Sequence, residues 1–234
     1  MNKEIPISHK HESPLPKERW GVSFSVVTIS GLPGCGNTVL AQNLAEKYGV
    51  KLVNIGQLLR ESVEEPNLPI IDYNKRPVKV DEELDELQAK TIKRSVLIIS
   101  NPTIIEAKLA GVIATEVLRT IPPEQQALSP VLRILVVADE DIRAERIKKR
   151  EIEKHPDLEI TQEEIIDKTR NRWRRDLTRY RSLHDVLTDV VDPWDSENKN
   201  NFYDFVIDTS NLTPEETVEK VHEYLQEQGL VSLY

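Results

Sequence analysis

One short segment of this sequence, residues 31–38 (GLPGCGNT), has residue types and spacing suited to phosphate chemistry. The chain has only eight glycines, and Gly31, Gly34 and Gly36 fall within six positions of one another. Successive backbone N–H groups can hold a phosphate only where no side chain blocks its approach, and glycine leaves that approach open. The segment is therefore typical of a loop that binds the phosphates of a nucleotide such as ATP.

The elements predicted on either side of this segment are those that a phosphate loop requires. An apolar, β-branched stretch at residues 23–30 predicts a buried strand, and a helical pattern follows from Thr38 to Tyr48. The positive end of that helix would point at a bound phosphate. A tight strand-to-helix turn without a ligand is the alternative interpretation, but the strand, the spacing and the helix together favour the phosphate loop.

The end of the segment predicts a metal ligand and also a missing charge. Thr38 stands where a hydroxyl would join the coordination shell of Mg²⁺. The usual pattern has a lysine just before that residue, and Asn37 replaces it, so the loop lacks a charge that stabilises a transferring phosphoryl group. Cys35 and Val39 are further expected nucleotide contacts. For Cys35 we favour a small residue that fits the loop over a reactive thiol.

A second candidate site is a charged face of a predicted helix. Arg172, Asp176 and Arg179 are spaced i, i+4 and i+7, which places them on one helix face. Two arginines with an acid between them can clamp a phosphate or a ribose. The alternative is a solvated face with routine ion pairs worth about 0.2–0.5 kcal/mol each. The phosphate loop elsewhere in the chain favours the clamp.

A third group of charges, Arg143, Arg146 and Arg150, shares a face of the helix expected after the fourth strand. In phosphoryl transfer a protein mainly positions the reactants and neutralises charge. A mobile lid rich in arginine does both and also excludes water. Ordinary solvation of a charged helix explains these residues equally well from the sequence alone.

Strands alternate with helices along the chain, which predicts an α/β fold: a P-loop three-layer sandwich, with a parallel sheet and helices on both faces. Residues 96–99 and residues 103–105 compete as candidates for one strand. The last helix has a full start signal, with Thr213 as N-cap, Pro214 first and Glu216 three residues after the cap. The other expected strands cover residues 51–54, 131–138 and 205–210. The other expected helices begin near Gly56 and cover residues 81–94, 109–120, 140–152 and 162–187, with loops at 64–79, 121–130 and 192–201.

Composition and charge argue against several classes of function. The net charge of −9 disfavours broad binding to nucleic acids or anionic membranes, and no stretch approaches the roughly 20 apolar residues of a membrane span. The single cysteine, Cys35, allows no disulfide within the chain and indicates a reducing, cytoplasmic compartment. Residues 1–20 are polar and rich in proline, and they predict a flexible arm without a signal sequence.

In their order and intervals, the motifs resemble those of the cytidylate kinases, particularly the compact archaeal-type branch. The resemblance runs from about Ser25 to Glu223, most of the chain. It favours residues 103–105 as the strand, because IIEAKLAG is similar to the stretch that follows the family's third strand. The motifs that carry it are VVTISGLPGCGNT, KLVNIGQLLRE, VDEELDELQ, IIEAKLAG, RAERIKKR, RWRRDLTRY and YDFVIDTSNLTPEE.

The resemblance implies a role for each matching residue. Those expected to bind the cofactor nucleotide are Gly31, Gly34, Cys35, Gly36, Asn37, Thr38 and Val39. Those expected to bind the acceptor nucleotide are Gly56, Arg60, Lys108, Arg172, Asp176 and Arg179. The expected catalytic residues are Asn37, Lys108, Arg146 and Arg150, and the expected magnesium ligands are Thr38 and Glu106.

The chain departs from the family pattern at four positions. Asn37 replaces the lysine of the loop, which bears on catalysis. Lys108 replaces an arginine, which keeps the charge but loses the planar fork of donors. Ala107 replaces a glycine, and Ile55 stands where bacterial relatives often have a serine near the base. These three departures bear on the identity of the acceptor.

The implied activity is transfer of a phosphoryl group from ATP to a nucleoside monophosphate, CMP or dCMP, with Mg²⁺. Nucleotides are the expected partners, and no nucleic acid, membrane or disulfide partner is expected. The expected organisation is one P-loop kinase-like domain at residues 21–234, with an acceptor-binding insertion at about 57–94 and a lid at about 146–190. Two alternatives stay open: a nucleotide-binding pseudokinase, which Asn37 supports, and a kinase for another small acceptor.

Overall fold

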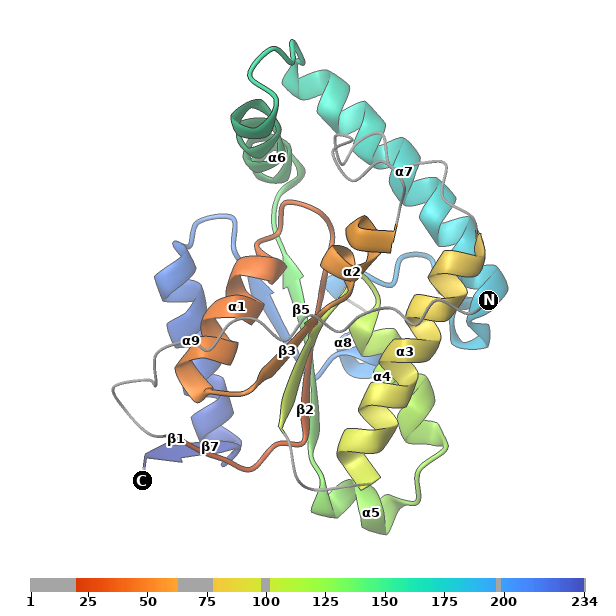
Figure 1. Cartoon of the computed structure of the whole chain (residues 1–234), viewed down its shortest axis with the longest axis vertical. Helices are drawn as coiled ribbons and strands as arrows, with labels where there is room; N and C mark the ends of the chain where they lie inside the picture. The colour runs from red at the N-terminus through yellow and green to blue at the C-terminus, as the bar shows by residue number, and fades with distance from the viewer. Residues whose placement is uncertain (1–19, 63–77, 98–101, 197–198, 234) are drawn as a thin grey trace.

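The computed structural model describes residues 20–62, 78–97, 102–196 and 199–233 (Figure 1). Within these ranges five parallel strands form a sheet in the order β3-β4-β2-β5-β6. The strands are short and rich in β-branched residues, and β2 and β4 are buried along their whole length, as expected of strands with helices on both faces. The strands are β2 (Val26–Gly31), β3 (Lys51–Asn54), β4 (Thr103–Glu106), β5 (Val131–Val137) and β6 (Phe205–Asp208).

Strand β4 confirms the prediction for residues 103–105. Of the competing stretch, Val96 and Leu97 end a helix, and residues 98–101 lie outside the described residues. The register sets Ile29 of β2 opposite both Glu106 of β4 and Ile134 of β5. Glu106 therefore lies at the carboxyl edge of the sheet, beside the start of the glycine-rich segment.

Helices cover both faces of the sheet, which confirms the predicted α/β sandwich (Figure 1). One apolar core lies between the sheet and α1 and α9, and includes Leu44 and Val221. The other lies between the sheet and α3 and α4, and includes Ile92 and Ile113. These helices and the shorter ones are α1 (Asn37–Tyr48), α2 (Ile55–Ser62), α3 (Val78–Leu97), α4 (Ala110–Arg119), α5 (Pro123–Leu128), α8 (Lys199–Phe202) and α9 (Pro214–Glu227).

Two further helices, α6 (Glu140–Lys154) and α7 (Gln162–Leu183), project beyond the carboxyl edge of the sheet (Figure 1). A small apolar cluster that includes Ile147 and Ile165 packs one helix on the other. The connection ends in a capping box, in which Thr161 accepts from the backbone of Glu164 and the Glu164 side chain accepts from Thr161. A cap of this kind contributes about 1 kcal/mol, so the start of α7 is fixed locally by its own sequence.

Several boundaries differ from the sequence-based expectations. Helix α7 was expected to run to residue 187, but the backbone at His184 is extended and a 3-10 turn (Asp185–Leu187) follows. Residues 121–130 were expected to form a loop, yet α5 forms there with Pro123 in its first turn, a position that proline tolerates. Helix α3 is longer at both ends than expected, covering Val78–Leu97.

A two-stranded antiparallel ribbon, β1 (Trp20–Val22) with β7 (Val231–Leu233), was not predicted. Each strand has three residues, too few for a periodic pattern, and the pairing joins the two ends of the described chain. Trp20 was assigned to the N-terminal arm, but it lies in β1 and its ring packs edge-on against Tyr48 and His222. The rest of that arm, residues 1–19, lies outside the described residues.

Candidate active site

The phosphate loop, residues 31–38, connects β2 to α1 at the carboxyl edge of the sheet. Gly34 and Gly36 have φ angles of 89° and 91°, a left-handed conformation that other residues rarely adopt. A Cβ atom at Gly34 would also lie 2.6 Å from the carbonyl oxygen of Arg143 in α6. Glycine is therefore needed at Gly34 for its conformation and for the close packing of α6 on the loop.

Asn37, at the position of the usual lysine, donates its side-chain amide to Glu106 Oε1 at the end of β4. Glu106 is buried, and this burial raises the pKa of its carboxyl to about 7, although the Thr38 hydroxyl, the Arg60 charge and the Asn37 amide oppose the shift. Oε2 of Glu106 is buried and makes no hydrogen bond to any residue that the structure describes. At the position where the usual pattern has a lysine, the loop thus presents a neutral amide bound to an acid.

Cavities lie on both sides of the phosphate loop. The α9-side cavity, about 300 Å³, runs over the loop to the residues that precede and begin α9. The α3-side cavity, about 160 Å³, runs from the loop between α2, α3 and α7. Residues that line both cavities are Gly34, Asn37, Thr38 and Arg150. Two ligands, one in each cavity, would therefore meet at the loop.

Helix α6 brings two of its predicted arginines to this junction. Arg146 donates to the carbonyl oxygen of Gly34 at 3.3 Å, and to the hydroxyl and the carbonyl of Thr209 at 3.0 and 2.7 Å. One turn later, Arg150 donates from Nε to Glu151 Oε1 at 3.2 Å. Its Nη2 atom is buried and makes no hydrogen bond to any described residue. Arg146 thus holds α6 against the loop, and Arg150 is available to a ligand.

The predicted clamp residues come together around one buried carboxylate, that of Asp176. Arg179 Nη2 lies 3.1 Å and Arg172 Nε 3.6 Å from its oxygens, and Lys108 Nζ donates to the same group. Trp194 supports Lys108, since its indole N–H donates to the Lys108 carbonyl at 2.6 Å. Lys108, Arg172 and Arg179 outnumber the carboxylate, so this cluster, the Asp176 cluster, carries net positive charge suited to an anionic ligand.

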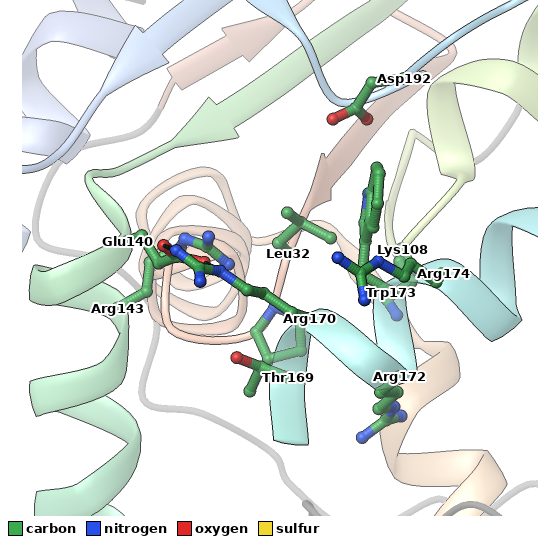
Figure 2. Close-up of a pocket in the computed structure, with 11 residues that line it drawn as sticks. Leu32, Lys108, Glu140, Arg143, Thr169, Arg170, Arg172, Trp173, Arg174 and Asp192 are labelled. Carbon is green, nitrogen blue, oxygen red and sulfur yellow. Dashed lines mark hydrogen bonds and ion pairs between the residues drawn. The ribbon is translucent and has the colours of Figure 1, made fainter. Parts of the chain in front are cut away.

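A further cavity, about 300 Å³, lies between α6, α7 and the outer side of the phosphate loop (Figure 2). Arg170 of α7 donates from Nε to Glu140 of α6 at 2.8 Å, and this bond lowers the pKa of the Glu140 carboxyl. In Figure 2 Arg172 points away from that ion pair, and the Trp173 ring lies beside Leu32 and extends toward Asp192. The Arg170–Glu140 pair joins the two projecting helices at the surface.

Other predicted residues also line these cavities. Gly56 and Arg60 line the α3-side cavity, and Val39 lines the α9-side cavity at the surface. Cys35 is buried, and burial raises the pKa of its thiol to about 11, which supports the interpretation of a small, unreactive residue. In the part of the chain that the structure describes, no three His, Cys, Asp or Glu side chains gather as they would around a metal ion.

Sequence reasoning missed several residues of the α3-side cavity. Asp85 and Gln88 of α3 line it, as do Asn54 at the end of β3 and Tyr180 of α7. In the sequence, Asp85 and Gln88 look like part of a solvated acidic helix. Their i, i+3 spacing on one face was the available signal, but many surface helices have the same spacing.

Comparisons with known proteins show the family of this chain. A family model described as an AAA domain matches residues 30–177. A cytidylate kinase of Methanopyrus kandleri is 32% identical to this chain over 82% of it and 88% of that protein. The chain belongs to the cytidylate kinase family. A cytidylate kinase of Pyrococcus abyssi is 30% identical over 81% of this chain and 87% of its own length. Membership of the cytidylate kinase family makes this a nucleotide-binding, kinase-type P-loop protein.

Solved structures support the fold. An uncharacterized protein from Eubacterium ventriosum aligns with a TM-score of 0.54 at 16% identity, over 86% of this chain and 98% of its own. Shikimate kinase from Acinetobacter baumannii aligns with a TM-score of 0.50 at 10% identity, over 89% of this chain and 96% of its own. At such identities the similarity is one of fold alone. No helix in the described ranges has the length and apolar character needed to cross a membrane.

Proposed function

We propose that this protein transfers the γ-phosphoryl group of ATP to a nucleoside monophosphate, CMP or dCMP, in the cytoplasm. The observation that carries the proposal is that two cavities meet at one phosphate loop and share Gly34, Asn37, Thr38 and Arg150. Transfer between two bound nucleotides needs such a junction, because donor and acceptor phosphates must come within bonding distance of each other.

In this proposal ATP occupies the α9-side cavity, with its phosphates on the backbone of the loop and the N-terminus of α1. The monophosphate occupies the α3-side cavity, where Arg60, Lys108 and Arg172 supply positive charge. The clamp residues Asp176 and Arg179 hold its ribose and orient the neighbouring guanidinium groups. Gly56 lines the same cavity, and a Cβ there would lie 3.6 Å from Arg60 Nη1, an ordinary van der Waals contact.

No covalent enzyme intermediate is needed. An oxygen of the acceptor's phosphate attacks the γ-phosphorus of ATP and forms the new P–O bond. The bond from the γ-phosphorus to the β–γ bridging oxygen breaks, and that oxygen leaves on ADP with the electron pair. The protein supplies position and charge, which is most of what such transfers require.

The residues at the loop suit Mg²⁺, which prefers oxygen ligands. The Thr38 hydroxyl and the Glu106 carboxylate are such ligands, and Oε2 of Glu106 is buried without a hydrogen bond to a described residue. When bound with ATP, the ion would neutralise charge on the donor phosphates. Because burial raises the pKa of Glu106 to about 7, the carboxyl must lose its proton before it can act as a ligand.

The charge that Asn37 does not provide has a candidate source in Arg150. This residue lines both cavities, and its buried Nη2 atom makes no hydrogen bond to a described residue. A guanidinium group at this point would reach the phosphate that is transferred. Arg146, which is bound to Gly34 and Thr209, would hold α6 so that Arg150 stays in place.

A nucleotide-binding pseudokinase is the second candidate, and one contact favours it. The Asn37 amide is already bound to Glu106, so it neither carries charge nor points freely into the loop. Such a protein would bind ATP and sense or scaffold without turnover. The changed acceptor side, with Ile55 and Lys108, also leaves a kinase for another small acceptor as a variant of the first proposal.

A coupled assay of ADP release over a panel of nucleoside monophosphates, run beside calorimetric titration of ATP and each acceptor, separates these candidates. Turnover with CMP or dCMP supports the kinase. Turnover with a different acceptor supports a kinase but replaces CMP or dCMP as the proposed substrate. Binding of ATP without turnover supports the pseudokinase, and absence of both binding and turnover would reject every version of the proposal.

A further inference from the structure

A chain of hydrogen bonds leads from the surface of α4 to the wall of the α3-side cavity. Glu116 of α4 contacts His184 Nδ1 at 2.8 Å, and His184 Nε2 contacts Asp85 Oδ2 of α3 at 3.3 Å. The other oxygen of Asp85 accepts from Gln88 Nε2 at 2.9 Å. The chain joins three helices and ends at Gln88, a residue that lines the cavity.

The charges of Glu116, His184 and Asp85 fix the donor and the acceptor in each of these hydrogen bonds. Burial disfavours a charged His184, but its bonds to Asp85 and Glu116 and the charges of those groups raise the pKa of the imidazole to about 9. At neutral pH the ring is therefore protonated, and both of its nitrogens donate. Asp85 then acts only as an acceptor, so the NH₂ group of Gln88 must face it. The opposite orientation of the amide would place two acceptor oxygens together.

In this orientation the amide oxygen of Gln88 is a hydrogen-bond acceptor without a donor among the described residues. Gln88 is only 2% exposed, and its Oε1 atom makes no hydrogen bond to any residue that the structure describes. A buried acceptor without a partner costs about 1–3 kcal/mol. A ligand in the cavity that donated to this oxygen would remove that cost.

We propose that Gln88 Oε1 accepts a hydrogen bond from the exocyclic amino group of the acceptor base, and that Asp85, His184 and Glu116 hold Gln88 in the accepting orientation. The inference rests on the proposed function, since it assigns the base of the monophosphate to the α3-side cavity. In this proposal Gln88 determines the specificity for the acceptor base, and His184 is a positioning residue.

The proposal selects one class of base. Cytosine carries an amino group where uracil carries a carbonyl oxygen, so uracil would bring an acceptor against the acceptor of Gln88 and near the carboxylate of Asp85. Adenine also has an exocyclic amine, so this contact selects bases that carry an amino group over uracil. CMP is therefore expected to bind more tightly than UMP by about 5- to 150-fold, the equivalent of one unsatisfied buried polar group.

The test is calorimetric titration of the full chain with CMP, UMP and ATP, for the natural protein and the variant Gln88→Met. Methionine has a similar length but no amide. The expected result is that Gln88→Met reduces the ratio of CMP to UMP affinity to below about threefold and leaves ATP binding unchanged. Gln57→Met, on the exposed side of α2 and outside the cavity lining, is the matched control and should keep the natural ratio.

Intact ATP binding and an unchanged thermal midpoint show that the variants fold. His184→Gln tests the positioning role: it should lower the CMP to UMP ratio partly, because one amide cannot donate to Asp85 and Glu116 as the imidazolium does. Equal affinity of the natural protein for CMP and UMP, or an unchanged ratio in Gln88→Met, overturns the inference while the proposed function stands. Failure of the natural protein to bind any monophosphate, with ATP still bound, overturns the proposed function and this inference with it.

Discussion

The phosphate loop and the Asp176 cluster contribute different parts of a phosphate site, the loop its backbone geometry and the cluster its charge. The loop keeps the glycine spacing, the left-handed turns and the helix N-terminus of a phosphate site, but its lysine position holds Asn37, bound to Glu106. The Asp176 cluster has a less specific sequence pattern, yet it gathers Lys108, Arg172 and Arg179 on one buried carboxylate. Backbone geometry and positive charge are thus provided by separate parts of this molecule.

The largest expected effect comes from restoring charge to the loop. Asn37→Lys should raise turnover of CMP, by about 10²–10³-fold at most, because that is the usual cost of losing one preorganised donor to a transition state. Steady-state ADP release measures the change. Asn37→Met is the control, because methionine is similar to lysine in length but has no charge. Its turnover should not rise above that of the natural protein. If Asn37→Lys does not raise the activity, Arg150 already supplies the missing charge in full, as proposed above, or Lys108 does.

The next effect tests the charged half of the comparison. Arg172→Ala should weaken CMP binding by roughly 10- to 100-fold, the range for a hydrogen bond to a charged group, with little effect on ATP. Calorimetry with each nucleotide gives the two affinities. Arg175→Ala, an exposed arginine of the same helix, should change neither. Equal losses for CMP and ATP in Arg172→Ala would mean that the Asp176 cluster serves both nucleotides.

A third effect concerns the support of α7, which carries the Asp176 cluster. The pKa of His184 is about 9 in the folded chain and near 6.5 when unpaired, so the folded state binds the proton more tightly. The stability that this adds is complete below pH 6.5 and is lost as the pH rises through 9, on the order of 3 kcal/mol in all. Denaturant unfolding across this range measures it. In His184→Gln this part of the pH dependence should disappear, and an unaltered profile would assign it elsewhere.

The smallest effect is expected at Cys35. Because burial raises the pKa of this thiol to about 11, it is almost wholly protonated at pH 8 and closed to reagents. Alkylation by iodoacetamide should be slow in the native protein and fast after unfolding in guanidinium. If the native protein is alkylated as fast as the unfolded chain, the prediction is wrong. The Cys35 thiol would then be a reactive group of the loop.

The sequence predicted the sheet and the loop well because local signals specify them. Glycines at Gly34 and Gly36, the β-branched strands and the capping box at Thr213 each act within a few residues. It did not predict Asp85, Gln88 and His184 as a unit, because their contacts join helices about 100 residues apart. The contact between Asn37 and Glu106 was also hidden, although the role of each residue was considered separately.

The ribbon of β1 and β7 has a consequence for engineering. Trp20 pairs with Leu233, so the first and last strands of the described chain lie side by side, at the opposite end of the sheet from α6 and α7 (Figure 1). A short linker could join them, and the chain could then be reopened in the turn between α6 and α7 as a circular permutant. Such a permutant would break the chain between the two projecting helices, and their apolar packing, the Arg170–Glu140 pair and the hydrogen bond from Gln162 to the Asp141 carbonyl would then hold them together. The relative motion of α6 and α7 could then be changed by substituting the charged residues Arg170 and Glu140.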